Sequence, residues 1–346
     1  MLKRRFLPVG QFLVLFFLVQ TILASAIAAS DSGVVLQRIK ERGFLICGTG
    51  ENELGFAAQT DASWSGLYVD LCRALAAATL QDGAAVKFRP LAGAERFAAV
   101  ARGEVDILAR STALAFSSDT MAGAIFVVPF YYDGTGFLIR KSSQISSALE
   151  LSGAQICLIS GSLARINVNR FFQAREMKFS LVNSDTWSGV VSQFTTGSCT
   201  VMAADLTHLA IQQSQLTGAK QYALLPEIIS TETFGPTVAS HDWIWFKIVR
   251  WVVHALIRAE ELGISKDNVR NLENGSPVQK QFLETAALGA RELGLHPEWL
   301  IDMLEDVGNY GEIYERNLGK ASGLDIVRRL NALTRDGGLL FAPAFR

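Results

Sequence analysis

The order of short apolar runs and longer periodic segments constrains the fold of this chain more than any other feature of its sequence. Residues 43–47, 86–88 and 105–108 are short apolar runs typical of buried strands. Between them, 69–80 and 94–102 carry apolar residues at helical spacing. Strands that alternate with helices of about ten residues predict a parallel sheet with helices on its faces. We therefore expect an α/β protein.

A second alternation of the same kind follows in the middle of the chain. Strands, each followed by a helical segment, are expected at 155–159, 179–182 and 200–203. The two series are joined by β-rich segments at 125–128 and 136–139, with a turn at 132–134 between them. Residues 226–236 have the pattern of a return crossing, and the chain from Trp243 onward is mainly helical in pattern.

These two series predict two lobes, each a sheet flanked by helices, with a cleft between them. A little over 300 residues beyond the N-terminal leader is long for one domain and comfortable for two. We assign 29–135 to the first part of lobe one and 136–235 to lobe two. The last segment, 236–346, is expected to return to lobe one and to add a C-terminal helical extension.

The first residues, 1–28, have the pattern of a secretory signal peptide. Basic residues at 3–5 precede an apolar run at 12–23, and the small residues at 24–28 offer A-x-A cleavage sites. A retained membrane anchor is the alternative, but the apolar run is shorter than the roughly 20 residues that a span requires. We therefore expect export to the periplasm and cleavage of this segment.

The balance of charge argues against two classes of partner. The chain has 32 basic and 33 acidic side chains, giving a formal net charge of −1, and its Lys and Arg residues form no cluster outside the leader. Nucleic acids and anionic membrane surfaces attract concentrated positive charge. We therefore expect neither as a partner.

Four cysteines lie two in the first third of the chain and two in its middle. An exported chain with an even number of cysteines is expected to form disulfides. One bond in each lobe suits the spacing better than two bonds across a cleft that must open, which predicts Cys47–Cys72 and Cys157–Cys199. A zinc site is the alternative, but there is no Cys-x-x-Cys pair and the four histidines are scattered.

Polar residues follow the strand expected at 105–108. Ligands of open α/β sheets bind at the carboxyl ends of strands, so Arg110, Ser111 and Thr112 are candidate ligand contacts. The strand at 43–47 is followed by Gly48 and Gly50, which leave the backbone free to approach a ligand.

Eight short motifs run through nearly the whole chain beyond the leader. They are GFAA at 55–58, ERF at 95–97, GEVDIL at 103–108, YYDGTGF at 131–137, SALELSGAQIC at 147–157, LPEIIS at 225–230, AEELGI at 259–264 and VGNYGEIYERNLG at 307–319. In this order the chain resembles the periplasmic solute-binding proteins of polar and general amino-acid ABC importers, and the last motif is the most specific. The resemblance implies the two-lobed type II periplasmic binding protein fold.

The resemblance also implies how a ligand is held in the cleft between the lobes. In the family, a hydroxyl-rich loop and an Arg bind the ligand carboxylate, a Gly-Thr-Thr turn offers helix amides, and an Asp accepts the ammonium. Asp205 matches the ammonium acceptor here, and Arg110, Ser111 and Thr112 match the head of the loop. Ser162 lies in the turn of lobe two.

The sequence departs from the family pattern at several positions. Ser118 stands where the carboxylate-binding Arg is expected, Ala113 and Ala115 replace hydroxyl residues, and the lobe-two turn reads Gly-Ser-Leu at 161–163. Tyr68 replaces an acidic residue that is more often structural. A carboxylate without a paired cation is costly to bury, so Ser118 in place of the Arg predicts a specificity shifted toward an amine or a modified amino acid unless another cation, such as Arg110, takes over.

Each candidate residue has a structural alternative. Asp205 would also suit the N-terminal cap of the helix that follows it, and Ser162 that of its own helix. Arg110 would also suit a structural ion pair on the cleft wall.

The function implied by the resemblance is that of a binding component, which performs no reaction and needs no cofactor or metal. Its partners are a small-molecule ligand and the membrane subunits of an ABC transporter, and it acts as a monomer. One alternative is a periplasmic enzyme of the same fold, resembling the cyclohexadienyl dehydratases, for which Glu51 and Glu53 are the candidate acids. The other is a ligand sensor that is no longer coupled to transport.

Overall fold

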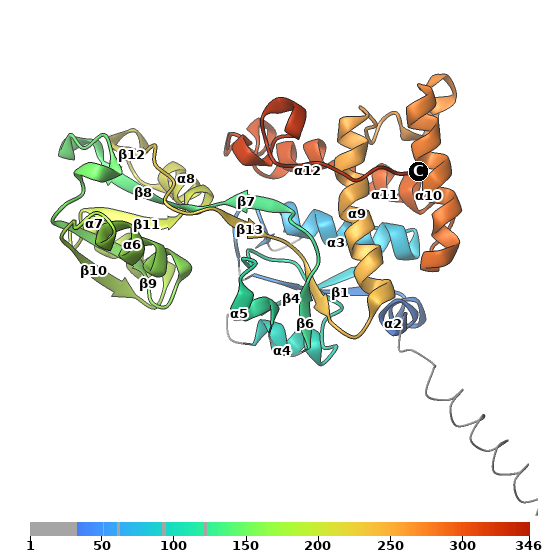
Figure 1. Cartoon of the computed structure of the whole chain (residues 1–346), viewed down its shortest axis with the longest axis horizontal. Coiled ribbons are helices and arrows are strands. Elements are labelled where there is room, and N and C mark those ends of the chain that lie inside the picture. The colour runs from blue at the N-terminus through green and yellow to red at the C-terminus, as the bar shows by residue number, and fades with distance from the viewer. Residues whose placement is uncertain (1–32, 51, 61–62, 92–94, 121–122) are drawn as a thin grey trace, which may run out of the picture.

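The computed structural model describes residues 33–346 except 51, 61–62, 92–94 and 121–122, so the expected signal peptide lies outside the described residues. The described chain forms two lobes, each built around a five-stranded sheet, joined by a long two-stranded ribbon (Figure 1). No helix in this part of the chain combines the length and the apolar character needed to cross a bilayer.

The sheet of lobe one is mixed, with the strand order β4-β1-β5-β14-β6. Its parallel part consists of β1 (Leu45–Thr49) between β4 (Val86–Pro90) and β5 (Ile107–Leu108). The last two strands, β14 (Thr237–Ala239) and β6 (Ala124–Phe126), are antiparallel to their neighbours. The parallel pairing predicted for the strands at 43–47, 86–88 and 105–108 is confirmed, and the sheet is mixed because the chain leaves for lobe two and returns from it through β6 and β14.

The helices of lobe one bury its sheet. They are α2 (Val34–Arg42), α3 (Leu67–Leu80), α4 (Arg96–Ala101), the short α5 (Phe116–Asp119) and α9 (Trp243–Glu261). Asp242 caps α9 by accepting the Trp245 amide at 2.9 Å, and its second oxygen accepts the Val35 amide at 2.8 Å, which ties α2 to α9. The Asp106 carboxylate of the GEVDIL motif accepts the Ile46 amide at 2.7 Å, so this motif residue has a structural role.

The sheet of lobe two has the strand order β10-β9-β11-β8-β12. Its strands are β10 (Phe179–Ser184), β9 (Ala154–Ile159), β11 (Val201–Asp205), β8 (Thr135–Arg140) and β12 (Tyr222–Leu224), the last two antiparallel to their neighbours. Its helices are α6 (Leu163–Gln173), α7 (Trp187–Thr196) and α8 (Leu206–Gln215). Each of these helices begins within four residues of the carboxyl end of a strand, which places three helix N-termini at one edge of the sheet.

The structure contains one disulfide in each lobe. Cys47–Cys72 joins β1 to α3, and Cys157–Cys199 joins β9 to the residues just before β11. These are the two pairings that the sequence predicts. Because each bond lies within one lobe, neither restricts the movement of the lobes relative to each other.

The ribbon between the lobes consists of β7 (Tyr131–Asp133) and β13 (Glu232–Phe234), which pair antiparallel. The expected turn at 132–134 is therefore wrong for Tyr132 and Asp133, which belong to β7. The predicted return crossing at 226–236 contains β13. Local sequence cannot show this pairing, because the two strands come from opposite ends of lobe two.

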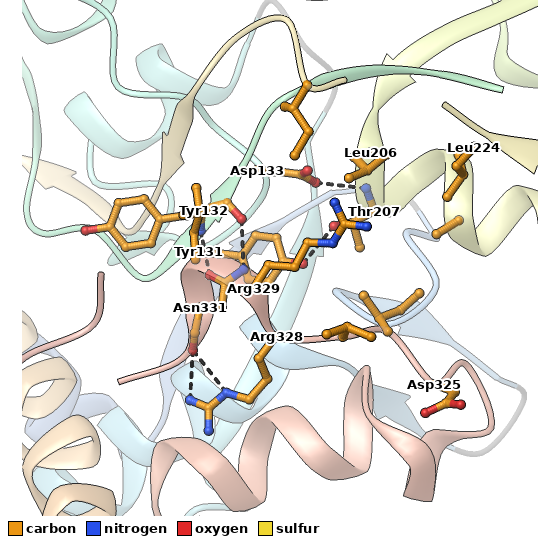
Figure 2. Close-up of a pocket in the computed structure, with 15 residues that line it drawn as sticks. Tyr131, Tyr132, Asp133, Leu206, Thr207, Leu224, Asp325, Arg328, Arg329 and Asn331 are labelled. Atoms are coloured by element: carbon orange, nitrogen blue, oxygen red, sulfur yellow. Dashed lines mark hydrogen bonds between the residues drawn. The ribbon is translucent and has the colours of Figure 1, made fainter. Parts of the chain in front are cut away.

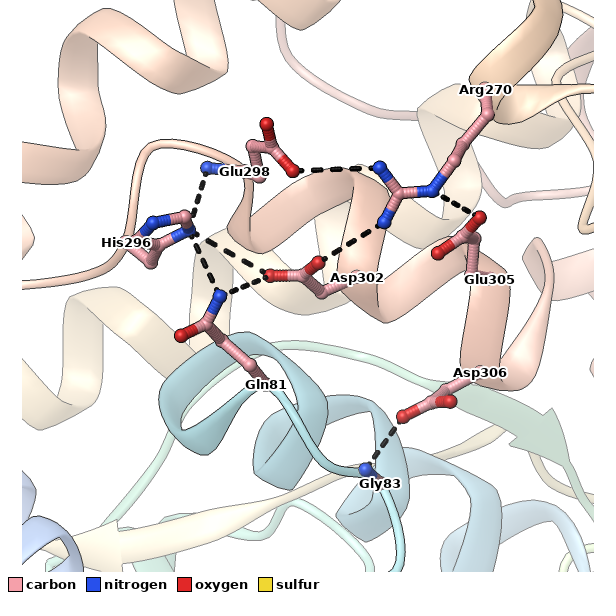
Figure 3. A network of polar contacts seen from close by, with 8 residues as sticks. All are labelled: Gln81, Gly83, Arg270, His296, Glu298, Asp302, Glu305 and Asp306. Carbon is pink, nitrogen blue, oxygen red and sulfur yellow. Dashed lines mark hydrogen bonds and ion pairs between the residues drawn. The ribbon is translucent and has the colours of Figure 1, made fainter.

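A C-terminal helical unit packs on lobe one. Its main helices are α10 (Pro277–Leu293), α11 (Trp299–Val307) and α12 (Tyr310–Asn317). Figure 3 shows how α11 is attached: one guanidinium, that of Arg270, contacts three acidic side chains, Glu298, Asp302 and Glu305. Asp306 accepts the Gly83 amide of lobe one at 2.6 Å.

The last part of the chain runs back to the ribbon between the lobes (Figure 2). The buried side chain of Asn331 accepts the Tyr132 amide at 2.7 Å and donates to the Tyr132 carbonyl at 2.8 Å, like an additional strand partner. Arg328 pairs with Glu260 of α9. The C-terminal segment thereby attaches β7 to the body of lobe one.

Candidate functional site

Two adjoining hollows between the lobes form one cleft. Their volumes are about 510 and 610 Å³, within the usual range for small-molecule sites of about 300–1,000 Å³. Five residues line both hollows: Ser111, Trp187, Asp205, His208 and Phe234. Because Ser111 belongs to lobe one and Asp205 to lobe two, a solute in the cleft would contact both lobes.

Asp205 is the last residue of β11 and lies directly before α8. Its side chain makes no capping hydrogen bond to that helix. The Thr207 amide instead donates to Asp133 Oδ2 of the ribbon, at 3.1 Å. The capping role considered for Asp205 is therefore filled by Asp133, and no described residue donates a hydrogen bond to the Asp205 carboxylate.

The surroundings of Asp205 disfavour its charged form. Burial raises the pKa of Asp205 well above its ordinary value, and the nearby carboxylates of Asp133, Glu232 and Glu53 raise it further. Burial also raises the pKa of Asp133 to about 6, against the opposing effect of its hydrogen bonds from Thr207 and Gly134. A cation placed beside these carboxylates would stabilise their charged forms.

Glu232, in contrast, has polar partners within its own lobe. Its Oε1 accepts from Asn167 Nδ2 at 2.7 Å and from Ser230 Oγ at 2.9 Å. It lines the cleft, but its hydrogen-bonding capacity is partly used. This leaves Asp205 as the cleft carboxylate of the described residues that has no hydrogen-bond donor.

Arg110 lies against the wall of lobe one and is mostly buried. One of its terminal nitrogens donates to the Leu91 carbonyl at 2.6 Å, and the other lies 3.5 Å from Glu53 Oε1. Ser111 Oγ donates to Glu53 Oε2 at 3.2 Å. Arg110 and Ser111 both line the cleft. Arg110 also forms an ion pair with Glu53, which is the structural role considered for it as an alternative to ligand contact.

Thr112 is placed differently from its two neighbours. Its amide donates to the Arg110 carbonyl at 2.6 Å in a tight turn, and its side chain is 3 % exposed. It is not among the residues that line the two hollows, whereas Ala113 and Ala115 are. The expected contact between Thr112 and a ligand therefore has no support in this geometry, because the turn directs this residue into the lobe.

Ser162 both lines the cleft and caps α6. Its hydroxyl accepts the Arg165 amide at 3.4 Å and donates to the Ile159 carbonyl at 2.8 Å. Leu163 and Ala164, in the first turn of α6, line the same part of the cleft. The positive end of this helix therefore faces the solute space.

Two of the predictions concern residues outside the described part. The side chain of Ser118, where the family pattern expects an Arg, belongs to α5 but lies outside the described side chains. Glu51, one of the two acids considered for an enzymatic alternative, also lies outside the described residues.

Several polar and aromatic residues that were not predicted from the sequence also line the cleft, among them Arg96, Trp187, His208 and Glu232. Trp187 packs against His208 with their ring centroids 4.2 Å apart. Burial lowers the pKa of His208 to about 4, so its imidazole is neutral near pH 7. Two sequence signals could have identified Trp187 and His208: Trp187 begins a helix after a strand, and His208 lies about one helical turn after Asp205.

Curated relatives match the chain over nearly its whole length, whereas no family model matches it. It is 40 % identical over 323 residues to the general L-amino acid-binding periplasmic protein AapJ of Rhizobium johnstonii, covering 92 % of this chain and 95 % of that protein. It is 39 % identical over 327 residues to the glutamate/glutamine/aspartate/asparagine-binding protein BztA of Rhodobacter capsulatus, covering 94 % and 97 %.

A solved structure agrees with these relatives. It is a periplasmic binding protein of an ABC transporter from Brucella ovis with glutathione bound, which is 40 % identical and superposes with a TM-score of 0.84. The match covers 90 % of this chain and 99 % of that one. The chain therefore belongs to the family of periplasmic solute-binding proteins of amino-acid ABC transporters, with the two-lobed type II fold.

Proposed function

We propose that this protein binds an amino acid or a related amine-bearing solute in the cleft between its lobes and delivers it to the membrane subunits of an ABC importer. The observation that carries the proposal is the Asp205 carboxylate, which faces the cleft without a hydrogen-bond donor among the described residues. An ammonium group is the complementary partner for such a carboxylate. The names of the relatives support the same class of ligand.

The arrangement of the lobes provides the mechanism. The ribbon of β7 and β13 joins two separately packed lobes, and movement about it brings the cleft walls together around a solute. The ammonium binds Asp205 of lobe two, and the rest of the solute contacts lobe one near Ser111. The closed form then docks as a monomer on the membrane subunits.

In this proposal the protein performs no reaction on its solute. Glu53, the described acid considered for an enzymatic role, has Arg110 and Ser111 as partners, which suits a wall residue of a binding site. The relatives are named as binding proteins, which supports the same view. A periplasmic enzyme and an uncoupled sensor have no comparable support.

The test is a thermal-shift and calorimetric screen of the mature protein with amino acids, amines and short peptides. A solute that binds only the folded form raises the melting temperature. For the best solute, Asp205→Asn should weaken binding by roughly ten- to a hundredfold, since a charge-assisted hydrogen bond contributes about 1.5–3 kcal/mol.

The control is Asp185→Asn, which removes an exposed carboxylate of the same lobe outside the cleft lining. It should bind as tightly as the unaltered protein. Equal affinity of the Asp205→Asn variant, or the failure of every amino-bearing solute to bind, would contradict the proposal.

A further inference from the structure

The described residues that line the cleft include more acidic than basic side chains. Two arginines, Arg96 and Arg110, line it together with four acids: Glu53, Asp133, Asp205 and Glu232. The whole chain, in contrast, has nearly equal numbers of acidic and basic side chains. The excess of acidic side chains is therefore a local property of the cleft.

Within lobe one, an internal carboxylate already contacts two of the donors that a ligand carboxylate could use, Arg110 and Ser111. Glu53 lies 3.5 Å from an Arg110 terminal nitrogen and accepts the Ser111 hydroxyl at 3.2 Å. The second terminal nitrogen of Arg110 donates to the Leu91 carbonyl. A carboxylate of a solute that approached Arg110 would have to displace Glu53 or lie beside it.

The local backbone holds Glu53 in this position. Its amide and carbonyl both bond to Ala57, at 2.8 and 2.7 Å, which closes a short loop at the rim of lobe one. Its side chain folds over Gly50, where an added Cβ would lie 2.1 Å from Oε1. The absence of a side chain at position 50 leaves room for this placement of Glu53 in the cleft wall.

Lobe two adds no positive side chain to the described lining. Asp133 and Glu232 have hydrogen-bond donors of their own, and Asp205 has none. An ammonium group of the solute neutralises the Asp205 carboxylate. The remaining acidic side chains of the cleft still outnumber the basic ones, so a second cationic or neutral group on the solute is favoured over a carboxylate.

We infer that the cleft selects a solute with a net positive charge, and that Glu53 is the residue that sets this preference against carboxylate-bearing solutes. The inference rests on the proposed function and deepens it. It separates this chain from its glutathione-bound structural relative, since glutathione carries two carboxylates and one ammonium near pH 7.

The experiment uses calorimetric titration of the mature protein with three solutes of nearly equal size: L-glutamate, L-glutamine and L-glutaminamide. Their net charges near pH 7 differ by about one unit per step, from negative to positive. Affinity should rise by roughly tenfold or more from each solute to the next, since one charge interaction of about 1.4 kcal/mol corresponds to a factor of ten. The pairs arginine and glutathione, and putrescine and succinate, extend the comparison to other sizes.

The decisive variant is Glu53→Gln, with Glu284→Gln as the matched control on an exposed face of α10. Glu53→Gln should reduce the preference for glutaminamide over glutamate by about tenfold or more, and Glu284→Gln should leave it unchanged. Thermal unfolding without solute checks that both variants are folded, and Glu53→Asp, which keeps the charge, should retain the preference.

The outcomes are distinct. A preference for glutamate or glutathione over the cationic solutes, or a preference unaltered by Glu53→Gln, overturns this inference while the proposed function stands. If only arginine and glutathione, or putrescine and succinate, bind, a preference for the cationic member of the pair supports the inference and a preference for the anionic member overturns it. Failure of every solute to bind contradicts the proposed function itself.

Discussion

The Thr207 amide donates its hydrogen bond to Asp133, 74 residues earlier in the chain, and not to Asp205, two residues before it. The ribbon between the lobes thus supplies the cap of α8, the helix that begins at the cleft. This arrangement provides a hydrogen-bond acceptor at the helix N-terminus and leaves the Asp205 carboxylate without a capping role. It also links the ribbon to the edge of lobe two that lines the cleft.

Removal of the Asp133 charge should alter how stability depends on pH. The folded-state pKa of Asp133 is about 6, above its ordinary value of 3.8. Because the folded-state pKa is raised, the contribution of Asp133 to the free energy of unfolding is fully present below about pH 4 and is lost as pH rises through about 6. Between pH 4 and 7.5, Asp133→Asn should lose less unfolding free energy than the unaltered protein, by at most about 3 kcal/mol. Urea unfolding without solute measures this difference, and parallel curves would contradict it.

Binding of an ammonium solute should strengthen as pH rises. The pKa of Asp205 is raised by burial and by Asp133, Glu232 and Glu53, and the ammonium binds its charged form. Affinity therefore increases as pH rises through the raised pKa, and binding at lower pH releases protons. His208, with a pKa of about 4, stays neutral over this range. Titration in two buffers of different ionisation enthalpy measures the protons released, and the release should fall in Asp205→Asn.

Each disulfide should stabilise its own lobe without affecting solute selection. The bonded cysteines are 25 and 42 residues apart, for which loop closure contributes about 3–4 kcal/mol each. Replacement of Cys157 and Cys199 by Ser should lower the unfolding free energy by about that amount. Mass spectrometry of the non-reduced protein should show two crosslinked peptides, each from one lobe. Free thiols, or a peptide joining Cys72 to Cys157, would contradict the assignment.

Loss of the Asn331 side chain should destabilise the attachment of β7. Asn331→Ala leaves the amide and the carbonyl of Tyr132 without their partner, at a cost of about 1–3 kcal/mol each. Asn331→Asp is the matched comparison, because it keeps the acceptor for the amide and loses the donor to the carbonyl. In denaturant unfolding, the Asn331→Ala variant should be less stable than the Asn331→Asp variant. Equal stability of all three proteins would show that the contact contributes little.

Ser118→Arg should improve the binding of common free L-amino acids. Ser118 stands where the family pattern carries the Arg that binds the ligand carboxylate. Restoring one ion pair of about 2–3 kcal/mol would raise affinity by roughly a hundredfold. Calorimetric titration of both proteins with the same amino acids tests this. Micromolar or tighter binding of these amino acids by the unaltered protein would show that Ser118 did not change the ligand.

Much of the candidate site could be predicted from the sequence. The strand expected at 105–108 pointed to Arg110 and Ser111, the family resemblance pointed to Ser162 and Asp205, and all four residues line the cleft. Thr112 does not line the two hollows, and the tight turn after Arg110, which local sequence does not show, decides its position. Whether these residues bind the solute remains a prediction that the variants above address.

The sequence by itself determined the α/β class, the two series of strands and helices, and the cysteine pairing, because burial periodicity and loop spacing are local properties of a chain. It did not determine that Tyr132 and Asp133 form a strand, since their partner β13 follows the whole of lobe two. The contact of Glu53 with Arg110 joins residues 57 apart, and that of Asp133 with Thr207 residues 74 apart. Only the tertiary structure decided these contacts, because the choice among several possible hydrogen-bond donors for a carboxylate depends on which strands pack side by side.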